Sequence, residues 1–240
     1  MSLNGSFLYK TEIPITDRII LQIPKVGEII DREEEYYAEV SMLTAMPADY
    51  MVQLHDLKIN YDEINEYELF TFILFKSIQE NDTGMVFKDL DLSRFELAYH
   101  RDTGQPVIYD ELDDIVIDRV IHTRIADTLR KMHRLEKNTK KPGNDDAREY
   151  LIERARKKEQ RARRRPRQSQ LEQLITAMVN TEEFKYGYEG TRELTIYQFN
   201  ESVRQIQHKV DYNNIMRGVY AGTVDPKSVS QDSLNWLIHK

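Results

Sequence analysis

Four carboxylates within five residues are the side chains of this chain that come closest to a chemical site. They are Asp110, Glu111, Asp113 and Asp114. Carboxylate oxygens bind hard divalent cations, so this cluster could hold a metal ion and support an enzymatic reaction. The cluster also stands just before a strongly periodic apolar stretch, and acidic residues are favoured at a helix N-terminus. We expect the helix-start role, because no further ligands occur nearby in the sequence.

The histidines show no spacing typical of catalysis or metal binding. None lies in the helical motif of two histidines and a glutamate that zinc hydrolases use. His122 follows Asp118 by four residues on an expected helix, which predicts a surface ion pair rather than an acid/base couple. The chain has no Walker loop, no dinucleotide-binding glycine pattern and no nucleophile elbow. We therefore expect no enzyme activity, no cofactor and no catalytic or metal-binding residues.

The most unusual stretch is a basic segment near the middle of the chain. From Arg148 to Arg167 there are ten Arg or Lys and three Glu, a local charge of +7 in a chain whose net charge is −7. Pro142-Gly143-Asn144 predicts a turn, the residues after it favour a helix of about 18 residues, and Pro166 ends that helix. The residues before and after this segment are both acidic overall. The pattern predicts a basic helix that joins two acidic bodies.

Three uses of this basic helix are open. Its cations occur on all sides, and Glu153–Lys157 and Glu159–Arg163 pairs would stabilise a solvated helix by roughly 0.2–0.5 kcal/mol each, which favours a charged strut. The helix could also dock on the acidic flanks or on an acidic partner, or contact the phosphates of nucleic acid. Nucleic-acid modules usually add stacking aromatics, and only Tyr150 lies nearby. The candidate electrostatic contact residues are Arg154, Arg156, Lys157, Lys158, Arg161, Arg163, Arg164, Arg165 and Arg167.

Residues 1–139 are expected to form an acidic α+β domain. Residues 12–26 combine β-branched residues with two prolines, a pattern typical of short strands at a sheet edge. Asn65 and Glu68 have the spacing of a capping box, and the segment after them is apolar on nearly every side. That segment predicts a buried helix, with a buried strand as the alternative.

A β-hairpin and an amphipathic helix are expected next. Phe95, Leu97 and Tyr99 alternate along one strand, a turn follows at residues 102–104, and Pro106 makes the second strand an edge strand. Apolar residues then recur at helical spacing after the acidic cluster. They are Ile117, Ile121, Ile125, Leu129 and Met132.

Residues 169–240 are expected to form a helical domain, separated from the first by a connector at 140–168. Thr195 and Gln198 form a capping box before an apolar seam that steps by three and four residues and must pack on another helix. Gly218 and Gly222 allow a close helix approach or a helix end, and Asp225-Pro226 predicts a final helix. Trp236 lies beside the apolar face of that helix, and we expect it in the core, with a partner contact as the alternative. The candidate protein interface comprises Ile196, Phe199, Val203, Ile206, Val210, Leu234, Trp236, Leu237 and Ile238.

Composition limits the class of protein. A hydrophobic share of 40% and a charged share of 31% are typical of a globular chain. The absence of cysteine excludes disulfides and thiolate metal sites. The longest apolar run is far shorter than the roughly 20 residues that span a bilayer, and no signal pattern is visible at the N-terminus. We expect a soluble, intracellular and mainly α protein with a small mixed α+β N-terminal part.

Several segments of the sequence resemble one family. They are LTAMPADYMVQLHDLKINYDEINEYELF, KKPGNDDAREYLIERARKKEQRARR, MVNTEEFKYGYEG, LTIYQFNESVRQIQ and MRGVYAGTVDPKSVSQDSLNWL. The chain is similar over most of its length to an uncharacterised group of phage and prophage proteins from Gram-positive hosts. Those proteins in turn resemble products of the tail-morphogenesis region, including tail assembly chaperone-like proteins. The long Arg-rich helix is a departure from typical tail chaperones.

The resemblance implies a noncatalytic structural or assembly protein whose partners are phage structural or assembly proteins, with no membrane contact. A chaperone of this kind would cover the apolar stripes of a long helical client until a tube polymerises around it. A component of the virion would bury the same surfaces permanently. The expected location is the host cytoplasm during assembly, or the virion. The alternative function is a nucleic-acid-binding accessory protein, in packaging or replication, that uses the basic helix at residues 148–167.

Overall fold

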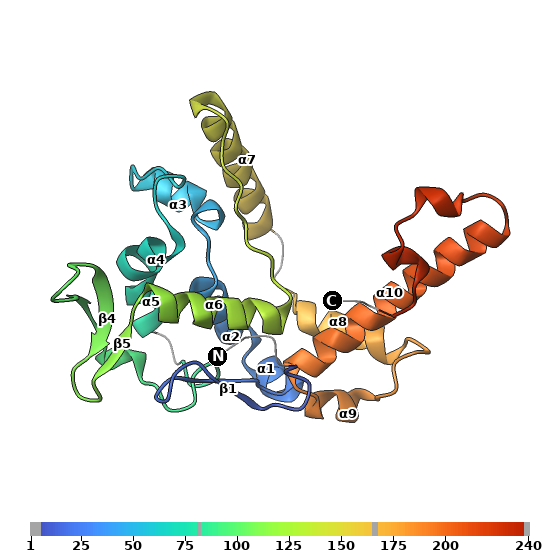
Figure 1. The fold of residues 1–240 in the computed structure, drawn as a ribbon, viewed down its shortest axis with the longest axis horizontal. Helices are drawn as coiled ribbons and strands as arrows, with labels where there is room; N and C mark the ends of the chain where they lie inside the picture. Colours follow the sequence, from blue (N-terminus) through green and yellow to red (C-terminus); the bar gives the residue numbers. More distant parts are fainter. Residues whose placement is uncertain (1–5, 81–82, 165–167, 238–240) are drawn as a thin grey trace. The chain divides into compact units, whose positions relative to one another are not determined.

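Two compact units make up the chain in the computed structural model, which describes residues 6–80, 83–164 and 168–237 (Figure 1). Unit 1 comprises Met1–Pro24 and Asp31–Ser169, and unit 2 comprises Lys25–Ile30 and Gln170–Lys240. Helices prevail, and the β-structure of the described residues forms two small antiparallel sheets. The predicted fold class, mainly α with a small mixed part, is therefore confirmed. The three-part division of the chain by charge stays a prediction.

Most helices and all the strands of the described residues belong to unit 1. In chain order its elements are β1 (Glu12–Pro14), β2 (Ile20–Gln22), α2 (Glu33–Leu43), η1 (Pro47–Asp49), α3 (Met51–Asp56), α4 (Glu66–Glu68), η2 (Leu69–Leu74), α5 (Phe75–Gln79), η3 (Leu92–Arg94), β3 (Glu96–Tyr99), β4 (Pro106–Asp110), β5 (Ile115–Ile117), α6 (Arg119–His133) and α7 (Asp145–Arg163). Unit 2 contains α1 (Val26–Asp31), α8 (Gln170–Val179), α9 (Tyr188–Glu193), α10 (Ile196–Tyr220), η4 (Pro226–Ser228) and η5 (Asp232–Leu234). Among the described residues, no helix has the length and apolarity needed to span a bilayer.

The core of unit 1 forms around α6. Its side chains at Ile125, Leu129 and Met132 are at most 1% exposed, because they lie on the helix face that contacts α2, α4 and β5. The helix begins where Asp118 Oδ1 accepts a hydrogen bond from the Ile121 backbone N–H at 2.8 Å. This confirms the amphipathic helix predicted from the spacing of its apolar residues, except that the first of them, Ile117, precedes the helix.

The buried helix predicted after Asn65 is also confirmed. The Asn65 side chain accepts from the backbone N–H groups of Tyr67 and Glu68, and the Glu68 carboxylate accepts from the Asn65 N–H. The chain then runs through α4, η2 and α5, and Leu69 and Phe70 are almost fully buried. The segment η2 is π-helical, a local widening of the helix that the apolar pattern did not predict.

The second strand of the predicted hairpin is not an edge strand. The sheet has the order β3-β4-β5, so β4 is central, and the prediction from Pro106 was wrong. Pro106 stands at the first position of β4, opposite Tyr99, where the loss of one backbone N–H removes little from the ladder. The third strand, β5, occupies residues that the sequence had suggested as the start of a helix. Ile117 therefore belongs to a strand, because Asp118 caps the helix only after it.

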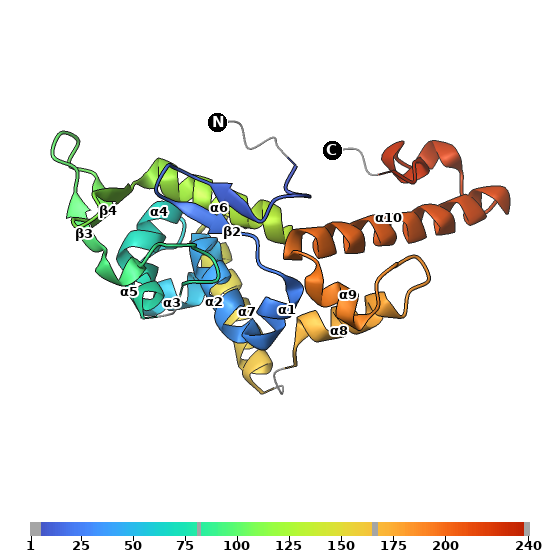
Figure 2. The ribbon, with the colours of Figure 1, turned by 90° about the horizontal axis from the view of Figure 1, so that it is seen from below.

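Unit 2 packs its core against the first turn of α10. Ile196, Tyr197 and Phe199 are buried there, and the capping box of Thr195 and Gln198 is present as predicted. Figure 2 shows α8 and α9 along the N-terminal part of α10, whose later turns extend beyond them. The N-terminal segment α1 completes this unit, since the Val26 N–H donates to the Leu194 carbonyl at 2.8 Å.

The predicted final helix after Asp225-Pro226 is replaced by two short 3₁₀ turns, η4 and η5. Asp225 does cap the first turn, since its side chain accepts from the Lys227 N–H at 2.9 Å. Ser230 and Asn235 also accept hydrogen bonds from nearby backbone N–H groups, at Ser233 and Leu237. Such local side-chain bonds compete with a helix, so the segment forms turns instead. The turn just before this segment closes tightly onto the end of α10, because a Cβ on Gly218 would lie 2.6 Å from Val224 Cγ2.

Candidate functional site

The basic helix α7 is anchored along one side to the rest of unit 1. Its Ile152 is 3% exposed and α7 packs on α3. The Arg148 guanidinium forms two bonds to the Asp62 carboxylate, at 2.8 and 3.0 Å, and Arg156 Nη2 lies 2.5 Å from Asp56 Oδ1. These hydrogen bonds lower the pKa of both carboxyl groups. One side of the helix therefore docks on acidic residues of its own unit.

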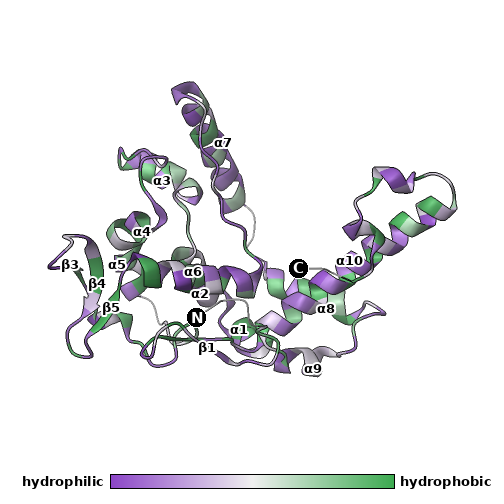
Figure 3. Ribbon diagram, in the orientation of Figure 1, coloured by the Kyte–Doolittle hydropathy of each residue, from purple (hydrophilic) through white to green (hydrophobic). Residues whose placement is uncertain are grey.

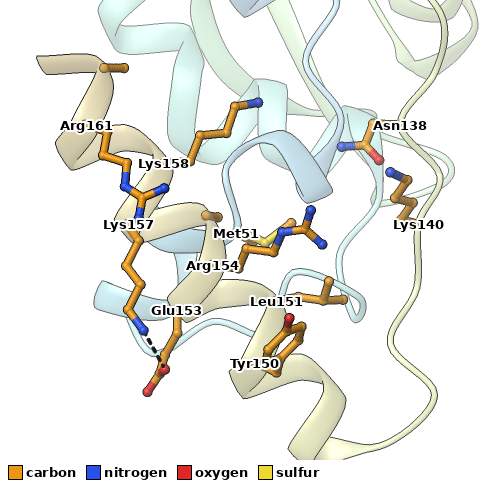
Figure 4. Close-up of a pocket in the computed structure, with 12 residues that line it drawn as sticks. Met51, Asn138, Lys140, Tyr150, Leu151, Glu153, Arg154, Lys157, Lys158 and Arg161 are labelled. Carbon is orange, nitrogen blue, oxygen red and sulfur yellow. Dashed lines mark ion pairs between the residues drawn. The ribbon is translucent and has the colours of Figure 1, made fainter. Parts of the chain in front are cut away.

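The other side of α7 lines a groove of about 880 Å³. Met51 of α3 and the segment that contains Asn138 and Lys140 supply the remaining walls. Figure 4 shows Arg154 extending from α7 toward Met51, with Asn138 and Lys140 across from it. The lining residues of α7 are Tyr150, Leu151, Glu153, Arg154, Ala155, Lys157, Lys158, Arg161 and Ala162. The groove thus combines cations with an exposed aromatic ring and apolar side chains.

The structure divides the predicted electrostatic residues into three groups. Arg156, Lys157 and Arg163 are paired with Asp56, Glu153 and Glu159, the last two at 3.7 and 4.0 Å as the spacing had predicted. A second group is exposed and forms no ion pair within the described residues. It comprises Arg154, Lys158, Arg161 and Arg164. Arg165 and Arg167 lie outside the described residues.

The acidic cluster begins at Asp110, the last residue of β4, and its other members lie in the turn to β5, so the prediction of a helix start was wrong. Asp110 is 1% exposed, and its Oδ2 lies 2.7 Å from Arg94 Nη2, which also pairs with Asp113. Asp110 Oδ1 accepts from the Leu112 N–H, and Asp114 accepts from the Tyr109 hydroxyl. The cluster therefore builds a tight turn around one arginine. Across the described part of the chain, no three His, Asp or Glu side chains converge as metal ligands.

His122 is a buried residue, so the predicted surface ion pair with Asp118 was wrong. Its side chain is 1% exposed, and its ring stacks on Phe70 with centroids 4.2 Å apart. Neither ring nitrogen has a hydrogen-bond partner. Burial lowers the pKa of His122 to about 3, since the charged form would lose its hydration. The imidazole is consequently a neutral packing group.

The apolar seam of α10 changes from buried to exposed along its length. Ile196 and Phe199 are 0% exposed and belong to the core of unit 2. Val203 and Ile206 are half-buried, and Val210 is 41% exposed. The available part of the predicted interface on this helix is therefore Val203, Ile206 and Val210. The interface itself stays a prediction.

The C-terminal members of the predicted interface lie on the segment that folds back along α10. His208 Nε2 lies 2.6 Å from the Asn235 carbonyl, and Gln205 Nε2 donates to the Trp236 carbonyl at 2.8 Å. Leu234 is half-buried, whereas Trp236 and Leu237 are 52% and 46% exposed. The expectation that Trp236 lies in the core was therefore wrong. Ile238 lies outside the described residues.

The groove was only partly visible in the sequence. Its cations and Tyr150 were visible there, but Met51, Asn138 and Lys140 were not singled out. These residues approach α7 because α3 packs on it and because Asn138 Nδ2 donates to Asp49 Oδ1 at 2.9 Å. The packing of α7 also depends on Asp56 and Asp62, whose arginine partners lie 100 and 86 positions later in the chain. Such long-range partners cannot be matched from one sequence.

The comparison with known protein families gives one match. Residues 157–239 match the family model described as the YomV second domain. YomV is a protein of a phage or prophage region, so this match indicates a phage-type protein. The match covers about a third of the chain, from the last turns of α7 through α10 and the C-terminal turns. No curated protein and no solved structure matches the chain.

Proposed function

We propose that this chain is a noncatalytic phage protein that acts in virion assembly through protein–protein contacts, in the manner of a tail-assembly chaperone or a structural component. Its expected partners are phage structural or assembly proteins. Two features support this proposal. One is the family match over residues 157–239, and the other is the exposed state of the C-terminal arm, which we define as residues 200–237.

The single observation that carries the proposal is that no residue of the C-terminal arm is buried. In contrast, the first turn of α10 buries Ile196, Tyr197 and Phe199. A helix of 25 residues is about 37 Å long, and most of this one lies beyond the core of its unit. Helices in water gain most of their stability from packing an apolar face. The arm is therefore a surface that gains stability from a partner.

The two sides of α10 within the arm differ. Figure 3 shows hydrophobic segments alternating with hydrophilic ones along the outer turns of this helix. At 3.6 residues per turn, Gln205 and His208 face away from the seam of Val203, Ile206 and Val210, and they hold the returning C-terminal segment. The seam is thus left half-exposed while the opposite side is covered by the chain itself. A half-exposed apolar stripe of this kind suits an amphipathic helix of a partner protein.

Co-expression tests the proposal. The chain is tagged and expressed with the proteins encoded in a phage tail-morphogenesis region, and the proteins that co-elute are identified. We expect one phage protein to co-purify with the intact chain and to be lost with the Ile206→Asp/Val210→Asp variant. The control for added charge is Gln160→Asp, which adds a carboxylate at an exposed polar position of α7, outside the arm. Recovery of the chain alone in every combination would contradict the proposal.

A further inference from the structure

The groove beside α7 has features that protein–protein assembly through the C-terminal arm does not use. Its volume is about 880 Å³, and five of its lining residues are Lys or Arg. They are Lys140, Arg154, Lys157, Lys158 and Arg161. Glu153 is the one acidic residue among the lining residues, and it pairs with Lys157 at 3.7 Å. The groove therefore carries a net positive charge in a chain whose total charge is negative.

The charges of α7 are distributed unevenly around the helix. Arg148 and Arg156 lie on the side of α7 that packs against the rest of unit 1, where Asp62 and Asp56 neutralise them. Arg154, Lys158 and Arg161 line the groove, and the described part of the structure gives them no carboxylate partner. Cations needed only to hold the helix in place would lie on its packed side. Those of the groove are available to a ligand.

The spacing of the unpaired cations fits a linear polyanion. Arg154, Lys158 and Arg161 are separated by four and three residues, so they lie in one row along the helix. This row covers about 10 Å of the helix axis, and Lys140 adds a positive charge on the opposite wall. A strand of nucleic acid presents one negative charge per nucleotide at a comparable spacing. Several adjacent phosphates can therefore be neutralised at once.

An aromatic ring stands at one end of this row. Tyr150 is 65% exposed although it lies on the same side of the helix as Arg154. Leu151 and Met51 line the groove beside it (Figure 4). An exposed ring next to aligned cations is the combination with which proteins hold unpaired bases, since every base can stack on it. An acidic peptide would use the cations and leave the ring without a partner.

We propose that the α7 groove binds a short stretch of single-stranded nucleic acid. The phosphates contact Lys140, Arg154, Lys158 and Arg161, and one base stacks on Tyr150. The packed side of α7 keeps the row of cations in place through the pairs of Arg148 and Arg156 with unit 1. The acidic residues elsewhere in the chain confine the contact to the groove, because they repel phosphates.

Fluorescence anisotropy with labelled 12-nucleotide probes tests the proposal on the full chain. The probes are oligothymidylate and oligouridylate, which separate DNA from RNA, and a duplex of equal length. We expect a single-stranded probe to bind more tightly than the duplex. Its affinity falls as salt rises, with a slope of about −0.7 for each phosphate contact. Tighter binding of the duplex, or an affinity that is independent of salt, would overturn the proposal.

Variants of the groove locate the contact. Arg154→Gln/Lys158→Gln/Arg161→Gln is expected to weaken binding at least tenfold and to make the salt slope shallower by about two, since three phosphate contacts are lost. The matched control is Lys10→Gln/Arg18→Gln/Lys76→Gln, which removes three exposed cations that do not line the groove. Equal losses in the two triple variants would show that only net charge matters and would reject the groove.

Substitutions of Tyr150 test the stacking contact without changing the charge. Tyr150→Ala is expected to weaken binding at least fivefold with an unchanged salt slope, whereas Tyr150→Phe keeps the ring and the affinity. Thermal melts of each variant verify that it is folded. Equal affinities of the Ala and Phe variants would contradict the stacking. If a polyglutamate peptide displaced the probe as well as an unlabelled oligonucleotide does, the groove would be assigned to an acidic protein. Loss of nucleic-acid binding would leave the proposed assembly function untouched, because that function uses the C-terminal arm.

Discussion

Helices α6 and α10 have the same kind of apolar spacing and reach different states. In α6 the side chains of Ile125, Leu129 and Met132 are at most 1% exposed. In α10 the seam starts equally buried at Ile196 and Phe199 and then becomes exposed. A three-and-four spacing therefore specifies a helix with an apolar side, and the available neighbours decide whether that side is covered. Helix α6 is covered along its apolar side, whereas the seam of α10 is covered only at its start.

The largest expected effect comes from shortening a side chain in α6. Leu129→Ala removes buried volume at a residue that is 0% exposed, and we expect the free energy of unfolding to fall by about 3 kcal/mol. Ile206→Ala in the seam of α10 is expected to change it by less than about 1 kcal/mol, because water already reaches that side chain. Chemical denaturation of both variants measures the difference. Equal losses would mean that the seam of α10 is a core surface.

A second expected effect concerns pH and the buried ring of His122. Its pKa is about 3 in the folded chain and about 6.5 when unfolded, so the unfolded state binds more protons between these values. Stability due to the neutral ring is therefore present above pH 6.5 and is lost as the pH falls below it. At pH 5 the loss amounts to about 2 kcal/mol relative to pH 7.5.

Replacement of His122 isolates this effect. The parent chain is expected to lose unfolding free energy between pH 7.5 and pH 5, and His122→Leu is expected to make this loss smaller by about 2 kcal/mol. The substitution breaks no hydrogen bond, because neither ring nitrogen has a partner. The control is His100→Leu, which replaces a histidine that is exposed and not part of the core. A variant at 122 with the pH dependence of the parent chain would show that the ring is not buried as described.

A smaller effect tests the segment at residues 221–224, which closes onto the end of α10 because the Thr223 and Val224 N–H groups donate to the Gly218 carbonyl. Gly218→Ala would place a Cβ 2.6 Å from Val224 Cγ2, so the segment must shift. We expect a loss of about 1 kcal/mol in the free energy of unfolding, although alanine favours a helix more than glycine does. Gly218→Ala/Val224→Ala should restore it, because the smaller side chain at 224 makes room. A single variant more stable than the parent chain would mean that the segment does not pack there.

Local rules predicted the parts of the fold that depend on neighbours in sequence. The capping boxes at Asn65 and Thr195 lie within three residues of their partners, and both occur in the structure. The start of α7 after Asn144 follows the same logic, since Asn144 Oδ1 accepts from the Ala147 N–H. The strand β5 was missed because an apolar run of three residues fits a strand or a helix start equally well. Only its pairing with β4 decides between them.

The candidate sites were predictable in composition and not in geometry. The cations of α7 were evident, yet which of them Asp56 and Asp62 neutralise depends on the packing of α3. Likewise the seam of α10 was evident, but the point at which it leaves the core is set by the extent of unit 2. Trp236 was assigned to the core because large aromatic residues are usually buried, and the turns that replaced the final helix leave it half-exposed. Tertiary packing is the information that one sequence does not supply.

Amide hydrogen exchange of the free chain tests the central claim most directly. The claim is that the chain itself stabilises the C-terminal arm only weakly, because the arm contains no buried residue. We predict that amides from Val203 to Tyr220 in α10 exchange at least about a hundredfold faster than the core amides of α6, because few buried contacts oppose their local opening. Protection of these α10 amides equal to that of α6 in the free chain would contradict the account.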